Sequence, residues 1–301
     1  MSRSYVGAYW GPRRQSVDEC ADQLAQLLPA MAAIDPALMG WRNLGKSKRQ
    51  ALAQPVVTTD HSDLVKRLLD DRIRNDIKGE VIEDLGYSLY WWNSIDDSRA
   101  AAKLSVHIAA TSAAVGNSVV LNLPDPESVP GLYTPDTAHK LMHTIVQIFD
   151  PDSAVWCNHD LRKKQSEPDQ PLEGGGYRLG QVIGYPAGWA NYLSDRDTTT
   201  FDSTLIPPTA SIERIGNGTL VMLGDDPANP PFHAVLAMRA AMGYPVTFRE
   251  QEATPPAGVP ASVPGSATAK ADAVHYDAAR QAKPSPTPTA PESPDRAHGD
   301  R

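Results

Sequence analysis

The chain has 301 residues, of which 41% are hydrophobic, a formal net charge of −8 and two cysteines. This acidic balance argues against a protein that binds nucleic acid or an anionic membrane directly, because either would need a basic face. No apolar run approaches the roughly 18 residues of a membrane span, and the first five residues lack the apolar segment of a signal peptide. We therefore expect a cytoplasmic protein in which Cys20 and Cys157 are buried free thiols.

The C-terminal segment 251–301 differs in composition from the rest of the chain. It holds nine of the 27 prolines and consists mostly of Ala, Pro, Ser and Thr. Such a segment cannot bury enough apolar surface to offset roughly 1–2 kcal/mol of ordering entropy per residue. We predict a disordered tail there and a single domain over residues 1–250. The tail carries five basic and six acidic residues, so this domain keeps a net charge of −7.

Strand and helix signals alternate in the first third of the chain. A strand is predicted over residues 4–11, which are rich in aromatic residues and β-formers. Ser16 and Glu19 have the spacing of a capping box, which predicts a helix that begins there. A short strand is expected at 41–44, and a second helix after Asp60. The apolar positions of the first helix are spaced helically at Cys20, Leu24, Leu27, Leu28 and Met31.

The middle of the chain is dominated by strand signals. Three runs, at 86–95, 102–110 and 117–123, are separated by short polar or small-residue connections, which favours an antiparallel meander. Asp136 then begins a third helix, which Asp150-Pro151 ends. Together with the first third, this order indicates strands in consecutive groups with helices between them.

The last third contains a hairpin and a final helix. Residues 160–176 are polar and glycine-rich, and we expect a mobile loop there. Asn217-Gly218 is a strong hairpin signal between two apolar runs. A last helix is predicted over 232–242, with Gly243 as its left-handed cap. Strands are expected at 154–157, 179–183, 189–193, 211–215 and 219–223.

This order of elements predicts an α+β fold. Strands in consecutive groups pair mostly antiparallel, and helices that fall between the groups pack against the sheet. We therefore expect a largely antiparallel sheet with helices packed on one face, followed by the disordered tail.

Residues 40–47 match the phosphate-binding pattern G-x-x-x-x-G-K-[ST]. In such a site backbone N–H groups surround the phosphates, Lys46 would neutralise them, and Ser47 would bind Mg²⁺. The surrounding pattern contradicts this, because a helix that ends near Pro36 precedes the motif and only two helical turns follow it. We favour a turn with Lys46 in solvent. A nucleotide-binding enzyme of the P-loop type is the alternative.

His139 and His143 lie four residues apart on a predicted helix, a spacing that can place two imidazoles on one metal ion. Cys157 and His159 would be two further ligands of such a site. The second position of the His pair is not Glu, so the metalloprotease pattern H-E-x-x-H is absent. Solvated or capping roles for these histidines are favoured over a zinc enzyme.

Aromatic residues are concentrated on the predicted strands. Trp91 and Trp92 are adjacent on one strand, so they point to opposite faces, and at least one leaves the face that packs on helices. Either a second layer covers it or it is exposed. Exposed aromatic residues beside carboxylates are typical of protein-binding hot spots. Acidic pairs are also typical of turns. The residues predicted to bind a partner are Asp96, Asp97, Trp189, Tyr192, Asp195, Asp197, Asp225 and Asp226.

Small and aromatic residues recur in a characteristic order along residues 4–245. They lie in segment 5–13, at Gly40-Trp41, in segments 85–93 and 117–119 with Pro124, and in segments 188–194 and 218–221. In this order and spacing the chain resembles the immunity protein 52 family of bacterial polymorphic-toxin systems. These signatures are less specific than a metal or nucleotide motif, but they extend along the whole predicted domain.

The resemblance implies an α+β fold and a cognate toxin protein as partner. Such toxins are often nucleases with a restriction-endonuclease-like fold, delivered by a contact-dependent or type VI secretion route. A nuclease cleft is basic because it must attract phosphate, and an acidic inhibitor fits it. The resemblance assigns no catalytic residue, cofactor or metal to the chain, and it leaves the oligomeric state open.

Overall fold

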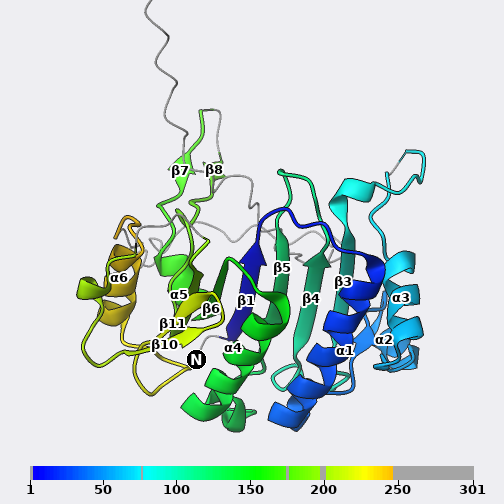
Figure 1. The fold of residues 1–301 in the computed structure, drawn as a ribbon, viewed down its shortest axis with the longest axis horizontal. Helices are drawn as coiled ribbons and strands as arrows, with labels where there is room; N and C mark the ends of the chain where they lie inside the picture. Colours follow the sequence, from blue (N-terminus) through cyan, green and yellow to red (C-terminus); the bar gives the residue numbers. More distant parts are fainter. Residues whose placement is uncertain (1–2, 76, 174–175, 197–200, 247–301) are drawn as a thin grey trace, which may run out of the picture.

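The computed structural model describes residues 3–75, 77–173, 176–196 and 201–246, so the predicted tail at 251–301 lies outside the described residues. One large sheet organises this part of the chain. Its strands are β1 (Ser4–Trp10), β2 (Arg42–Asn43), β3 (Tyr87–Trp92), β4 (Lys103–Ile108), β5 (Asn117–Asn122), β6 (Ser153–Asn158), β9 (Ala190–Ser194), β10 (Ser211–Ile215) and β11 (Gly218–Met222). They lie in the order β10-β11-β9-β6-β1-β5-β4-β3-β2, and each neighbouring pair is antiparallel (Figure 1). The predicted α+β class is confirmed.

Six helices accompany the sheet within the described ranges. They are α1 (Val17–Ile34), α2 (Lys48–Ala53), α3 (His61–Asp70), α4 (Pro135–Phe149), α5 (His159–Lys164) and α6 (Phe232–Ala241). Short 3-10 segments lie at Pro36–Leu38, Glu83–Leu85, Pro130–Tyr133 and Ser203–Leu205. None of these helices combines the length and the apolar character that a bilayer crossing requires.

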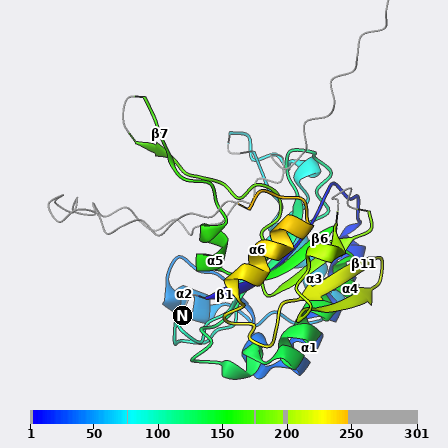
Figure 2. The ribbon, with the colours of Figure 1, turned by 90° about the vertical axis from the view of Figure 1, so that its left-hand side faces the viewer.

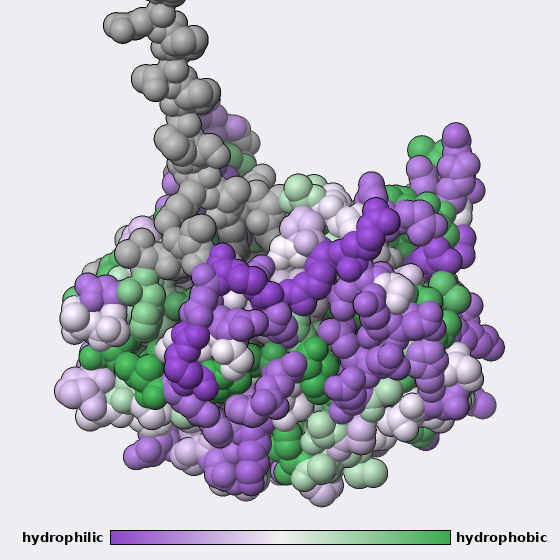
Figure 3. All heavy atoms as spheres, viewed as in Figure 1, coloured by the Kyte–Doolittle hydropathy of each residue, from purple (hydrophilic) through white to green (hydrophobic). Residues whose placement is uncertain are grey.

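The larger core lies between α1, α3, α4 and one face of the sheet, here called the first face (Figure 1). Alternation along β1 sends Val6, Ala8 and Trp10 into this core. Helix α1 contributes Leu24 from its apolar stripe. Hydrophilic residues predominate on the outer side of α1 and α3 (Figure 3), as expected for helices with one buried stripe.

A second, smaller core lies on the opposite face of the sheet, here called the second face. Val155 and Cys157 of β6 meet Leu161 of α5 and Val235 and Met238 of α6 there. The sequence predicted helices on one face, and α5 and α6 add a partial second layer. The order of apolar residues in a helix gives its period but does not say which face of a sheet it will cover.

The capping box at the start of α1 is confirmed. The Glu19 N–H donates to the Ser16 hydroxyl at 3.1 Å, and the Ser16 N–H donates to the Glu19 carboxylate at 2.7 Å. We expect Ser16→Ala to lower the free energy of unfolding by about 1 kcal/mol, because the Glu19 N–H loses its side-chain acceptor. Urea denaturation measures this. Ser16→Asp keeps a capping oxygen and should stay near the wild type, and equal losses in both variants would contradict the account.

The predicted meander and hairpin are both present. Strands β3, β4 and β5 are consecutive antiparallel neighbours, and β10 and β11 pair across Gly216-Asn217. The two tryptophans of β3 face opposite sides, as alternation requires. Trp91 lies in the first-face core, and Trp92 is also buried. The sequence left open whether one of these tryptophans is exposed or covered by a second layer, and the structure shows that both are covered.

Two local predictions between β6 and β9 are wrong. Residues 160–176 were expected to form a loop, but they contain most of α5 and the short strand β7 (Gln170–Pro171). A strand was expected at 179–183, but only Val182 makes a bridge there, to Ser166. Strand β8 (Tyr177–Arg178) precedes it and pairs with β7 in a separate two-stranded sheet. Figure 2 shows this ribbon extending away from the body of the molecule.

Candidate interaction surface

The two aromatic residues predicted as exposed partner-binding anchors are buried. Trp189 and Tyr192 are each 1% exposed and belong to the first-face core. The Trp189 indole N–H donates to the Gly224 carbonyl at 2.8 Å, which holds the chain beyond β11 against the start of β9. Because neither ring reaches the surface of the folded chain, we no longer assign them as surface anchors.

The predicted acidic residues that follow β3 and β11 lie beyond the C-terminal ends of two strands that run in the same direction, but these strands are far apart in the sheet. Asp96 makes an ion pair with Lys48, and the Asp97 carboxylate accepts from the Arg99 N–H at 2.9 Å. Asp225 and Asp226 follow β11, at the other end of the sheet. Six strand spacings of about 4.8 Å separate β3 from β11, so the two pairs are roughly 29 Å apart. They are exposed, but they do not form one cluster.

Asp195 follows β9, which runs antiparallel to β11, so it lies at the opposite ends of the strands from Asp225 and Asp226. Its carboxylate makes two hydrogen bonds with the Arg214 guanidinium, at 2.8 and 2.5 Å, and this contact keeps the pKa of Asp195 below its usual value. The negative charge of Asp195 is therefore balanced by the positive charge of Arg214. The remaining predicted acidic residue, Asp197, lies outside the described residues.

The segment that matches the phosphate-binding pattern has a different local structure from a phosphate-binding loop. Strand β2 lies inside the motif and not before it, and the buried Trp41 indole donates to the Leu38 carbonyl at 2.9 Å. Ser47 caps the six-residue helix α2 by accepting from the Gln50 N–H. A Cβ on Gly45 would meet the Ala51 backbone N at 2.6 Å, so Gly45 allows this segment to pack directly against α2.

The four residues considered as metal ligands are divided between the two faces of the sheet. His139 of α4, above the first face, makes an ion pair with Glu213 at 2.7 Å. His143 lies beside it, with 5.9 Å between the ring centroids. Cys157 packs in the second-face core, and His159 stacks on Tyr5, whose side chain belongs to that same core. In the described part of the chain, no group of three or more His, Cys, Asp or Glu side chains is placed to hold a metal ion.

Both thiols are buried, and burial is the main cause that raises the pKa of Cys20 and of Cys157 to about 12. Near pH 7 they are therefore protonated, whereas only the thiolate is the nucleophile that attacks a thiol reagent. We expect no reaction with Ellman's reagent in native buffer at pH 7.5 over an hour, and release of two equivalents in denaturant. Rapid reaction of either thiol in the folded protein would contradict the assigned burial.

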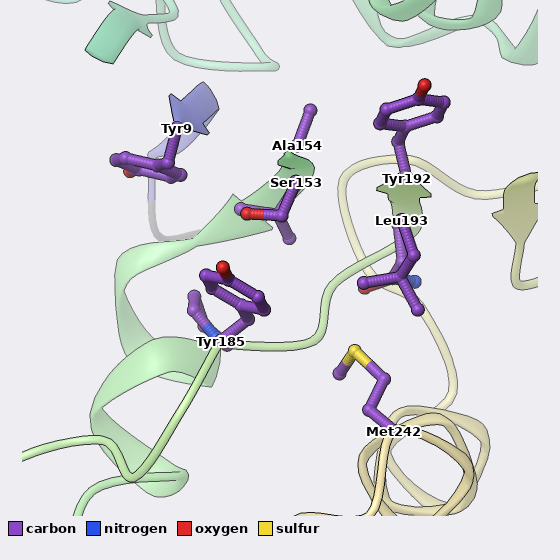
Figure 4. Close-up of a pocket in the computed structure, with 10 residues that line it drawn as sticks. Tyr9, Ser153, Ala154, Tyr185, Tyr192, Leu193 and Met242 are labelled. Atoms are coloured by element: carbon purple, nitrogen blue, oxygen red, sulfur yellow. The ribbon is translucent and has the colours of Figure 1, made fainter. Parts of the chain in front are cut away.

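A small hollow lies on the second face where β1, β6 and β9 meet the end of α6. In Figure 4 the rings of Tyr9 and Tyr185 flank it and the Met242 side chain closes one side. Gly7 matters for this shape, because a Cβ there would overlap the Tyr9 ring. None of the residues that line the hollow is Asp, Glu, Lys, Arg or His, and most of them offer apolar contact.

The two-stranded ribbon carries several large apolar side chains that are exposed. We call residues 166–183 the arm, of which 174–175 lie outside the description. Tyr177 is 69% exposed, Leu179 67% and Leu172 52%, and Ile183 is exposed at its base. A two-stranded ribbon cannot bury its own apolar side chains, and contiguous exposed apolar surface marks interaction sites.

Buried polar contacts fix the root of the arm. The Gln165 side chain is 1% exposed, accepts from the Ala187 N–H at 2.8 Å and donates to the Ala187 carbonyl at 2.7 Å. The Arg239 guanidinium of α6 donates to the carbonyls of Ile183 and Tyr185, each at 3.0 Å. Both chains of the arm are thus held where they leave the body, so the arm is anchored on the second-face layer.

The sequence contained a signal for the arm that the prediction did not use. Leu172, Tyr177 and Leu179 are large apolar residues within an otherwise polar stretch rich in glycine and proline. Large apolar residues grouped in one polar segment indicate a contact, either within the fold or with a partner.

Comparison with known proteins finds a family model and similar solved structures. The family model described as "Immunity protein 52" matches residues 2–242. No curated protein matches. Among solved structures, the chain is similar to one described as "Pseudomonas aeruginosa T6SS protein PA0821", with 10% identity and a TM-score of 0.48, over 80% of this chain and 72% of that one.

Proposed function

The chain belongs to the Immunity protein 52 family, and from this premise we propose that it protects the producing cell by binding and neutralising one cognate toxin. The observation that carries the proposal is the extent of the family match, residues 2–242, which includes all the strands and helices described above. Binding, and not catalysis, is the proposed mode of action. It is supported by the local structure of the phosphate-loop segment and by the separation of the His and Cys side chains.

We propose further that the toxin is a nuclease, of the restriction-endonuclease-like kind that the family resemblance implies, and that it reaches the cell by type VI secretion and is met in the cytoplasm. The support is electrostatic. Residues 1–250 carry a net charge of −7, and a nuclease cleft that attracts phosphate is basic. Opposite charge on two proteins raises their association rate and allows carboxylates to occupy phosphate positions.

The exposed acidic residues Asp96, Asp97, Asp225 and Asp226 are proposed to steer the toxin during its approach. Charges at the rim of an interface change the association rate and its salt dependence more than they change the final affinity. Two pairs roughly 29 Å apart can contribute to a long-range field without lying in one contact patch. Tight binding then needs apolar anchors elsewhere on the surface.

Co-expression tests the proposal. The toxin gene next to the gene for this chain is induced in a laboratory strain, with or without the full chain from a second plasmid. We expect growth arrest with the toxin alone and rescue when the chain is present. Continued killing, with both proteins soluble and expressed, would refute the immunity function. DNA or RNA degradation in the unprotected culture supports the nuclease assignment, and intact nucleic acid in dying cells would refute that part alone.

A further inference from the structure

We infer that the arm is the element with which this chain grips its toxin, and that its exposed apolar side chains enter a groove on the toxin with an apolar floor and a basic rim. This inference rests on the proposed immunity function. In this account the exposed apolar side chains of the arm supply the binding energy, because Trp189 and Tyr192 are buried.

The first argument is exposure. Tyr177 and Leu179 show about two thirds of their surface to solvent, on a ribbon that extends away from the body (Figures 1 and 2). Tyrosine and other large apolar side chains that become fully desolvated on binding are the usual hot spots of interfaces. A projecting ribbon can bury such side chains from both of its sides within a concave partner.

The second argument is that the arm is built to hold one position. Beyond the root contacts of Gln165 and Arg239, the Glu167 N–H donates to the Gln181 carbonyl at 3.0 Å, and the Gly180 N–H donates to the Asp169 carboxylate at 2.8 Å. A Cβ on Gly180 would collide with the Glu167 carbonyl, so the two chains of the arm approach as closely as they can. An element that is ordered before binding loses less conformational entropy when it docks.

The third argument is charge, and it decides the chemistry of the partner. The arm carries the carboxylates Glu167, Asp169 and Glu173 against the single cation Arg178, a net charge of −2. Arg178 is engaged with the Gln170 side chain on the neighbouring strand. Exposed apolar side chains on an arm with net negative charge fit an apolar groove edged by Lys and Arg, which is the surface expected beside a nucleic-acid site.

The open sides of the ribbon add a second mode of contact. Among the strands of the described ranges, β7 and β8 pair only with each other, through Gln170 with Arg178 and Pro171 with Tyr177. Their outer backbone groups therefore do not belong to a larger sheet. A partner strand can add to such an edge, with main-chain hydrogen bonds giving affinity and alternate side-chain pockets giving specificity.

The experiment measures binding of the full chain to the toxin encoded by the adjacent gene, carrying an inactivating substitution so that it can be purified. The test variant combines Tyr177→Asp with Leu179→Asp. We expect its Kd to rise by roughly 100-fold or more, since two hot-spot contacts are lost and charges are placed in the groove. Leu172→Ser, a milder change on the other chain of the arm, should weaken binding in the same direction.

Leu52→Asp is the matched control, because Leu52 is also an exposed leucine but lies on α2, near the opposite edge of the molecule from the arm (Figure 1). It should bind within about threefold of the wild type. All variants should keep the wild-type melting temperature, since each changed side chain is largely exposed.

The outcomes separate the two proposals. Wild-type binding with an unchanged Kd in the arm variants would overturn the role of the arm while leaving the immunity function intact. Equal weakening by Leu52→Asp would also overturn it. If the wild-type chain itself neither binds the toxin nor protects against it, the proposed function fails.

Discussion

Trp156→Ala is expected to lower the free energy of unfolding by about 3–5 kcal/mol. Trp156 of β6 is fully buried at the centre of an aromatic cluster. Its ring meets Tyr133 edge-on with 5.7 Å between centroids, and Trp189 with 5.9 Å. Its indole N–H donates to the Pro227 carbonyl at 3.0 Å. Alanine would leave a cavity bounded by two large rings and an unpaired buried carbonyl.

Urea denaturation followed by far-ultraviolet circular dichroism measures this loss without relying on tryptophan fluorescence. Trp156→Phe is the control, because it keeps an aromatic ring but removes the hydrogen bond to Pro227. This variant should lower the free energy of unfolding by about 1–3 kcal/mol, a smaller loss than the one expected for Trp156→Ala. A loss below about 1 kcal/mol for alanine would contradict the packing described for the first-face core.

Arg239→Met is also expected to lower the free energy of unfolding by about 3–5 kcal/mol. The Arg239 side chain is 0% exposed, and its guanidinium donates to the carbonyls of Ile183, Tyr185 and Pro245 and to the Gln165 side chain. Methionine fills a similar volume but donates no hydrogen bonds. The Gln165 oxygen would then be buried without this donor, and three carbonyls at a partly buried site would lose a charged donor at the same time, which costs more than the loss of a surface contact.

The expected loss has a local signature that hydrogen exchange can detect. Amide exchange should accelerate most around residues 183–187 and at the root of the arm, because these segments share the Arg239 contacts. Arg239→Lys keeps the charge with fewer donors and should fall between methionine and the wild type. Arg49→Met, at an exposed residue of α2, should stay within about 0.5 kcal/mol of the wild type. A similar loss at both sites would argue against a specific role for Arg239.

The parts of the fold that were predictable from the sequence have strong local signals. The capping box at Ser16 located the start of α1, and Asn217-Gly218 located the β10–β11 hairpin. Three strand runs with short connections gave the β3–β4–β5 meander. In each case the local chemistry and the tertiary structure favour the same conformation.

Helix α5 and the arm were missed because their stability does not come from local periodicity. Helix α5 has six residues and one buried apolar side chain, Leu161, so it shows no helical period. The Asn158 side chain caps it, accepting from the Leu161 N–H at 2.7 Å. The arm depends on Arg239, more than 50 residues away in the sequence. Contacts at such separation leave no trace in a local pattern.

The partner-binding role of the predicted residues stays a prediction. The structure shows that Asp96, Asp97, Asp225 and Asp226 are exposed in the segments that follow β3 and β11. The burial of Trp189 and Tyr192 was not foreseen. Alternation along β9 tells which face each side chain points to, but only the packing of α4 and β11 shows that the first face is covered there.

A titration of toxin activity tests the central claim most directly. The purified toxin from the adjacent gene is assayed on DNA and RNA substrates while the full chain is added in increasing amounts. If this chain is its immunity protein, activity should fall linearly and reach zero at a fixed molar ratio, as tight one-to-one recognition requires. Full activity in the presence of a tenfold excess of folded chain would contradict the account.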